Sequence, residues 1–321
     1  MGKIPVSACA YRHSNDVDTT TRIDSRDWDL IANTCVARAT TALKVPTGAY
    51  NELHCYHISN VFESMVGTQR TIRTVLEKSS GASDAVDVLA LARLQLEGLY
   101  AVCLMLESPQ YVDCYLQDYW HKLYVRFLLQ REEFKLLPRW AEYIRDSPTW
   151  INLQRIHVGV TEVQQWTVEH EELGTPLPAG VSAQRIPKFP TPGHAIIKIS
   201  DSVKRKMLER LYPEYVRLCS FAHGLAEATF TKQMFDKRSP FRALISEEQK
   251  RETFDKVVIS DAFTMSFLCI LQSTAELTAL YPNNMDLPEI AIKGWNSLSD
   301  ASLLGRTIWG IRTRRLFGVV A

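Results

Sequence analysis

The sequence predicts an all-α protein, built as a helical bundle with a long Pro-rich loop and a C-terminal helical extension. Apolar residues recur every three or four positions over most of the chain, which is the period of an amphipathic helix. Alternating apolar and polar residues, the pattern of a half-buried strand, are almost absent. The composition of 46% hydrophobic and 23% charged residues is that of an ordinary globular protein, and it excludes disordered, collagen-like and coiled-coil classes.

The first 173 residues divide into a polar arm and a helical region. Residues 1–27 have no hydrophobic period, so we expect a loosely ordered arm there, followed by helices from Trp28 through residue 173. Ser108–Pro109 and Ser147–Pro148 each predict a helix start, because a capping serine precedes a proline that fits the first turn. Helical stripes connect Ile58, Phe62, Met65, Ile72 and Leu76, and also Tyr111, Tyr115 and Tyr119.

The second part of the chain begins with a loop and returns to helices. Residues 174–199 contain five prolines and three glycines without a helical pattern, which predicts a long loop. Residues 200–321 form the C-terminal helical part, in which Asp201 is a predicted N-cap and Pro213 is predicted to start a new helix. A further long helix is predicted over about residues 246–281.

Charge and cysteine content narrow the functional classes. The formal net charge is +1, from 37 Lys and Arg against 36 Asp and Glu, so binding to nucleic acid or an acidic membrane would need a local patch. The seven cysteines are scattered and fit neither a disulfide framework nor a structural zinc site. The apolar run 262–275 has about 14 residues, fewer than the roughly 20 that cross a bilayer, and is predicted to be a buried helix segment. We therefore expect a cytoplasmic protein that does not enter a membrane.

No motif indicates a cofactor or a metal, and we expect neither. The chain lacks the glycine-rich loops that bind nucleotide phosphates, and it lacks the G-x-S-x-G and H-E-x-x-H motifs. Asp118 with His121, and His54 with His57, have spacings that could place two ligands on one helix face. Neither pair is accompanied by the carboxylate pattern of a di-iron or zinc centre, so we interpret both as polar helix positions.

One segment carries residues suited to a reaction without a metal. Residues 212–224 place Arg217 and His223 on one predicted helix with five residues between them. A histidine with a near-neutral pKa can take the proton of a ribose 2′-hydroxyl, and an arginine can stabilise the phosphorane oxygens. The pair is therefore a candidate for RNA cleavage, the alternative being a helix-terminal histidine that bonds locally beside Gly224.

Two segments of the chain resemble a known family. The segment Leu91-Ala92-Arg93-Leu94-Gln95-Leu96-Glu97-Gly98, with Leu218-Cys219-Ser220-Phe221-Ala222-His223-Gly224, resembles uncharacterised bacterial helical proteins that are similar to the HEPN superfamily. The resemblance covers about residues 85–235. It implies a dimeric, metal-independent endoribonuclease of a bacterial toxin or phage-defence type, although other members are inactive nucleotide- or partner-binding modules. By position it implies Arg217 and His223 as the catalytic pair and Arg93 with Glu97 as a supporting pair.

Other functions remain open from the residues alone. A non-catalytic helical scaffold would bind a protein partner, or pair as a homodimer, through an aromatic face such as Tyr111, Tyr115 and Tyr119. A small ligand could instead bind inside the bundle beneath the loop of residues 174–200, if polar groups converge on a cavity there. The C-terminal arginines could contact RNA phosphates or stabilise the end of a helix. They are Arg312, Arg314 and Arg315.

Overall fold

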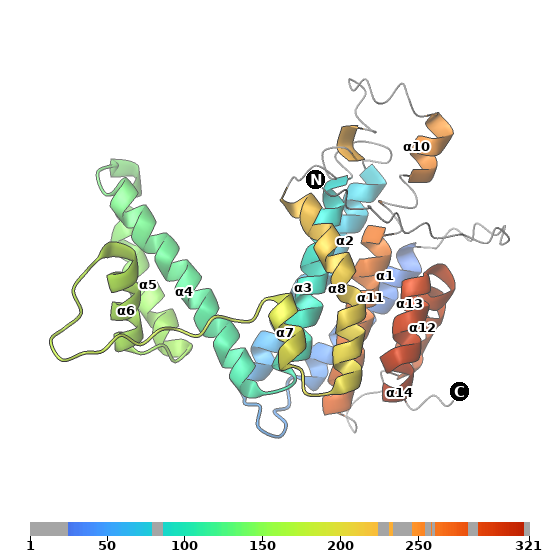
Figure 1. The fold of residues 1–321 in the computed structure, drawn as a ribbon, viewed down its shortest axis with the longest axis horizontal. Helices are drawn as coiled ribbons and strands as arrows, with labels where there is room; N and C mark the ends of the chain where they lie inside the picture. Colours follow the sequence, from blue (N-terminus) through green and yellow to red (C-terminus); the bar gives the residue numbers. More distant parts are fainter. Residues whose placement is uncertain are drawn as a thin grey trace, which may run out of the picture.

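The protein, seen in a computed structural model, consists of helices and loops throughout the residues that the structure describes (Figure 1). These are residues 25–78, 86–223, 231–233, 246–253, 258, 261–281 and 288–317. No strand occurs within these ranges, so the predicted all-α class is confirmed. Residues 1–24 of the predicted polar arm lie outside them, and the first helix begins at Ser25, close to the predicted start.

The bundle has two long apolar helices at its centre. α3 (Val88–Met105) and α11 (Asp261–Leu280) make the most extensive helix–helix contact of the described chain. Both are apolar on most of their circumference, because neighbouring helices cover them on several sides. The surrounding helices are α1 (Ser25–Ala42), α2 (Glu52–Lys78) and α8 (Ser202–Ala222).

The two central helices are also long and apolar enough to cross a membrane by length and composition alone. In the bundle, 67% of the apolar window of α3 and 83% of that of α11 are buried. The core helices of soluble proteins pass the same test of length and composition. Every residue from Ala262 to Ala275 is buried within α11, which confirms the predicted buried helix segment.

A helical arm projects from the bundle (Figure 1). α4 (Pro109–Phe134) contacts α2 and α3 and then continues outward, where α5 (Ala141–His157) and α6 (Glu162–Leu173) pack against it. A short 3₁₀ helix (Pro138–Trp140) precedes α5. The arm has its own small core, separate from that of the bundle. It contains Trp120, Tyr124, Phe127, Leu128, Ile151, Val160, Val168 and Ile186.

The chain returns to the bundle through an irregular segment and a short helix. Residues 174–191 have no regular structure, and α7 (Pro192–Lys198) follows within the predicted loop. α10 (Glu247–Thr253) precedes α11. The C-terminal extension is confirmed as helical, and its first helix packs against α1 and α11. It comprises α12 (Pro288–Ala301), α13 (Leu303–Ile308), a π-helical turn (Trp309–Thr313) and α14 (Arg314–Leu316).

Two predicted helix starts are wrong, because both prolines lie inside longer helices. Pro148 lies within α5, and Pro213 lies within α8. A proline inside a helix removes one hydrogen bond and costs about 3 kcal/mol. In α8, buried Leu211 and Leu218 flank Pro213 on both sides, and their contact with the core continues the helix across it.

Candidate functional site

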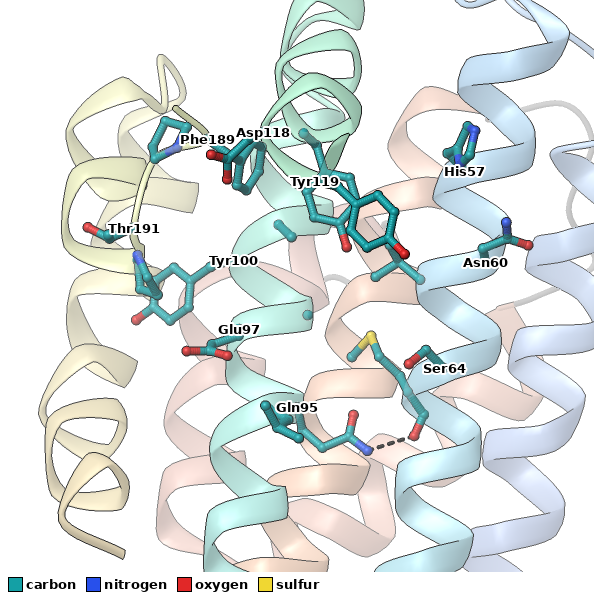
Figure 2. A pocket seen from close by; sticks show the side chains of 18 of the residues that line it. His57, Asn60, Ser64, Gln95, Glu97, Tyr100, Asp118, Tyr119, Phe189 and Thr191 are labelled. Carbon is teal, nitrogen blue, oxygen red and sulfur yellow. Dashed lines mark hydrogen bonds between the residues drawn. The ribbon is translucent and has the colours of Figure 1, made fainter. Parts of the chain in front are cut away.

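A cleft of about 720 Å³ opens on the bundle surface beside the base of the arm (Figure 2). α2 forms one wall with residues such as Ser64, and α3 forms the floor around Gly98. Residues 189–192 and Tyr215 of α8 form the opposite wall, while Tyr119 of α4 stands at one end. This volume lies in the range of small-molecule sites, roughly 300–1,000 Å³. The end of the predicted Pro-rich loop thus lines a cavity.

Small residues on α3 bring the floor of the cleft close to α2. A Cβ on Gly98 would lie 3.0 Å from Cγ of Met65 and 3.2 Å from its sulfur, so a larger residue would displace Met65. Ala101 lines the same floor about one turn further along α3. The absence of large side chains at these two positions leaves room above the floor.

Arg93, Glu97 and Tyr215 form a cluster on the α8 side of the cleft. Arg93 Nη2 donates a hydrogen bond to Glu97 Oε1 at 2.7 Å, one turn further along α3. Tyr215 Oη donates to the same oxygen at 3.1 Å, and the Arg93 guanidinium lies 5.8 Å from the centroid of the Tyr215 ring. The structure therefore brings the predicted supporting pair together, and the third member of its cluster is Tyr215.

Gln95 presents an unpaired oxygen at the floor. Its side chain is 1% exposed, and Nε2 donates to the backbone carbonyl of Met65 at 2.6 Å, as Figure 2 shows. The amide has to be oriented this way, because in the flipped orientation its oxygen would face the Met65 carbonyl oxygen and be repelled by it. Oε1 is left buried with no hydrogen-bond partner among the described residues. Such a group costs about 1–3 kcal/mol when it stays unpaired.

His57 lies on the α2 wall near the base of the arm. Its Nε2 is buried without a hydrogen-bond partner among the residues that the structure describes, and its ring lies 6.2 Å from the ring of His157 in α5. Burial above all, and then the neighbouring His157 and His54, lower the pKa of His57 and so favour its neutral imidazole at pH 7. His54 is engaged elsewhere, since its Nε2 lies 2.9 Å from Asp113 Oδ1. Within the described residues, no three His, Cys, Asp or Glu side chains form a group able to hold a metal.

The α4 end of the cleft combines an ion pair with aromatic rings. Lys122 Nζ donates to Asp118 Oδ2 at 2.6 Å, which neutralises a buried carboxylate. Tyr115 packs edge-on against Phe189, with ring centroids 5.1 Å apart. Tyr119 is 55% exposed at the mouth of the cleft. The aromatic stripe of α4 therefore contributes two of its three tyrosines to the cleft.

Arg217 and His223 lie apart from this cleft. Arg217 lines a separate cavity of about 180 Å³ between α8 and α11, where it donates to Glu214 at 2.9 Å and to Asp261 at 2.8 Å. Burial raises the pKa of Asp261, and the Arg217 charge opposes that rise. His223 is exposed at the C-cap of α8, and its N–H bonds to the Cys219 carbonyl at 3.1 Å. On an ideal helix, positions six residues apart point about 120° away from each other.

The three C-terminal arginines have different surroundings. Arg312 is 8% exposed, and its guanidinium donates to Glu276 and to Asp201. Arg314 is half-buried and Arg315 is exposed, both in the short helix α14. A phosphate at Arg312 would have to replace two carboxylates, whereas Arg315 can be reached from solvent.

Comparison of the chain with protein-family models, with curated proteins and with solved structures finds no match. The resemblance to the HEPN superfamily therefore stays a prediction. The function has to be inferred from the geometry of the cleft and of the Arg217 region.

Several residues of the cleft were not singled out as a site by sequence reasoning. His57, Asn60, Ser64 and Thr68 recur at helical spacing along one face of α2. That pattern is typical of any solvent-facing helix surface, so it gives no sign of a cleft. For Gln95 the sequence offers one weak indication of a special role, because this polar residue interrupts the largely apolar sequence of α3. Only the structure shows that its amide oxygen has no partner.

Proposed function

We propose that this chain is a non-catalytic binding protein whose cleft takes a small organic ligand. The observation that carries the proposal is the Gln95 amide oxygen, which is buried at the floor of the cleft without a hydrogen-bond partner in the part of the chain that the structure describes. His57 Nε2, on the α2 wall, and Arg93 Nε, on α3, are two further such atoms among the described residues of the same cleft. Polar groups inside proteins are almost always hydrogen-bonded, so three unpaired atoms in one cleft favour a ligand that bonds to them.

The charged groups of the cleft support binding rather than catalysis. Glu97 accepts hydrogen bonds from Arg93 and Tyr215, and Asp118 accepts one from Lys122. Both carboxylates therefore stabilise the walls of the cleft through bonds to neighbouring side chains, and an arrangement of this kind is suited to holding the shape of a binding site.

Equilibrium dialysis against a small-molecule cell extract, followed by mass spectrometry, tests this proposal. Ser64→Trp places an indole in the cleft from an exposed position of α2, so the variant is expected to fold. Glu63→Trp is the matched control, because the neighbouring Glu63 is exposed and does not line the cleft. We expect at least one compound to be enriched by the wild type and by Glu63→Trp, and not by Ser64→Trp. Equal enrichment by both variants, or none by the wild type, would overturn the proposal.

A second candidate function is metal-independent RNA cleavage by Arg217 and His223, in a HEPN-like protein of bacterial toxin or defence type. The exposure of His223 at the end of α8 favours it, because a general base has to reach its substrate. Arg217 would have to exchange Glu214 or Asp261 for a phosphate. A second copy of the chain would complete the site if the protein is a homodimer.

Incubation with mixed RNA in EDTA tests the second candidate. Cleavage by the wild type, with cyclic-phosphate ends, is expected to be lost in His223→Ala and in Arg217→Ala. Arg210→Ala is the control, because Arg210 is an exposed arginine of the same helix. Retention of activity in either active-site variant, or no cleavage by the wild type, would reject this function.

A further inference from the structure

We infer, resting on the proposed function of the cleft, that its ligand is an uncharged, planar aromatic molecule carrying an amide-type N–H donor. Three features of the cleft lead to this class. They are the internal balance of its charges, the aromatic character of its walls and the unpaired acceptor at its floor.

The charged side chains of the cleft neutralise each other. Each cation is bonded to a carboxylate of the same cleft, Arg93 to Glu97 at 2.7 Å and Lys122 to Asp118 at 2.6 Å. Among the described residues no further Asp, Glu, Lys or Arg lines the cleft, and the lowered pKa of the remaining titratable base, His57, favours its neutral form at pH 7. Arg93 Nε is buried without a hydrogen-bond partner among the described residues and can donate to a neutral acceptor on the ligand, while the Arg93 charge is balanced by Glu97. A charged ligand would therefore lose hydration without gaining an unbalanced counter-charge, so an uncharged ligand is favoured.

The walls of the cleft are rich in flat rings. Tyr115 and Phe189 meet edge to face at one end, with 82° between their planes, and Tyr119 stands beside them at the mouth. Tyr100 and Tyr215 form a second edge-to-face pair on the α8 side, with centroids 6.1 Å apart. Aromatic walls favour planar aromatic ligands, because stacked and edge-on ring contacts add to the burial of apolar surface.

The floor supplies the polar selectivity. Gln95 Nε2 is committed to the Met65 carbonyl, so only Oε1 is available, and an oxygen acceptor needs an N–H or O–H donor on the ligand. A carboxylate of the ligand in this position would place its oxygen against Gln95 Oε1, and the two acceptors would repel each other. An amide N–H satisfies Oε1 without bringing a charge into the cleft.

Three compounds of similar shape and different charge test this inference by isothermal titration with the full chain. They are nicotinamide, which is neutral, nicotinate, which is an anion, and 3-(aminomethyl)pyridine, which is a cation. We expect nicotinamide to bind at least about tenfold more tightly than the other two, the effect of one well-made hydrogen bond. Ser64→Trp is expected to abolish the binding, and Glu63→Trp to leave it unchanged.

Gln95→Met tests the donor requirement separately from the shape of the cleft. It replaces the amide with an apolar side chain of similar length and is expected to weaken nicotinamide binding about tenfold. Gln110→Met, at an exposed position of α4, is the control, and the melting temperature of each variant reports whether it folds. Unchanged binding in a folded Gln95→Met variant would overturn the donor requirement.

The outcomes separate this inference from the proposed function. If dialysis enriches a charged compound through the cleft, or nicotinate binds as tightly as nicotinamide, the ligand class is wrong and the binding function stands. If none of the three compounds binds, and the ligand enriched by dialysis is not an uncharged aromatic molecule with an amide-type N–H, the ligand class is again overturned. If dialysis shows no enrichment and none of the three compounds binds, both claims fail.

Discussion

Arg312 binds both carboxylate oxygens of Glu276, with Nε 2.8 Å from Oε1 and Nη2 2.8 Å from Oε2. Glu276 is 2% exposed within α11, so this pair fixes the C-terminal extension to the centre of the bundle. Arg312 also donates to Asp201 at the start of α8, and Lys204 bridges Glu276 and Glu107. Burial alone would raise the pKa of Asp201, but the Lys204 backbone N–H and the Arg312 charge hold it below its ordinary value.

Arg312→Met is predicted to destabilise the protein by about 3–5 kcal/mol, because it leaves Glu276 buried without its main partner. The free energy of unfolding from urea titration measures this. Arg315→Met, at an exposed position of α14, is the control and is expected to change stability by less than about 0.5 kcal/mol. Equal, small effects of both substitutions would show that the buried pair does not anchor the extension.

Lowering the pH is predicted to destabilise the protein, because His57 takes up a proton more readily in the unfolded chain than in the folded one. Because burial and the nearby His157 and His54 lower its pKa below 6.5 in the folded state, the unfolded chain binds more protons in the window below 6.5. The stability contributed by neutral His57 is therefore fully present above pH 6.5. It is lost as the pH falls from 6.5 to the lower pKa of the folded state. His57→Gln is expected to flatten the dependence of the unfolding free energy between about pH 7.5 and 5.5. Identical slopes in wild type and variant would contradict the assignment.

The arm is predicted to open at a lower free energy than the bundle. Its core is small, and α5 keeps large apolar residues at the surface, with Trp150 51% and Leu153 62% exposed. Segments with few buried contacts exchange their amide hydrogens through local opening. Hydrogen exchange followed by mass spectrometry should show α5 and α6 exchanging before α3 and α11. Uniform protection across the arm and the bundle would show that they unfold together.

Local features of the fold were predictable from the sequence. The serine before Pro109 caps α4, where Ser108 Oγ accepts from the Gln110 N–H at 3.3 Å. Asp201 caps α8 by accepting from the Val203 and Lys204 N–H groups. These signals depend on residues within one turn of each other. The same local signal failed at Pro148 and Pro213, which lie inside longer helices. At Pro213 the buried residues Leu211 and Leu218 show that tertiary packing overrides the preference of proline for the first turn, whereas the structure gives no such reason at the exposed Pro148.

The candidate site was predictable only where its contacts are local. Arg93 and Glu97 are one turn apart on a helix, so their pairing follows from spacing alone. The contact of Gln95 with Met65 joins positions 30 residues apart, and that of Tyr215 with Glu97 joins positions 118 apart. No periodic pattern encodes which helices meet, so the unpaired oxygen of Gln95 could be found only in the structure.

Methionine-methyl NMR tests the central claim, ligand binding in the cleft, most directly. Met65 lines the cleft, while Met207 and Met265 are buried elsewhere in the bundle. With the Met65 signal assigned by its loss in Met65→Leu, addition of the small-molecule extract is predicted to shift that signal and to leave those of Met207 and Met265 in place. An unchanged Met65 signal at saturating extract, or equal shifts of all three, would contradict binding in the cleft.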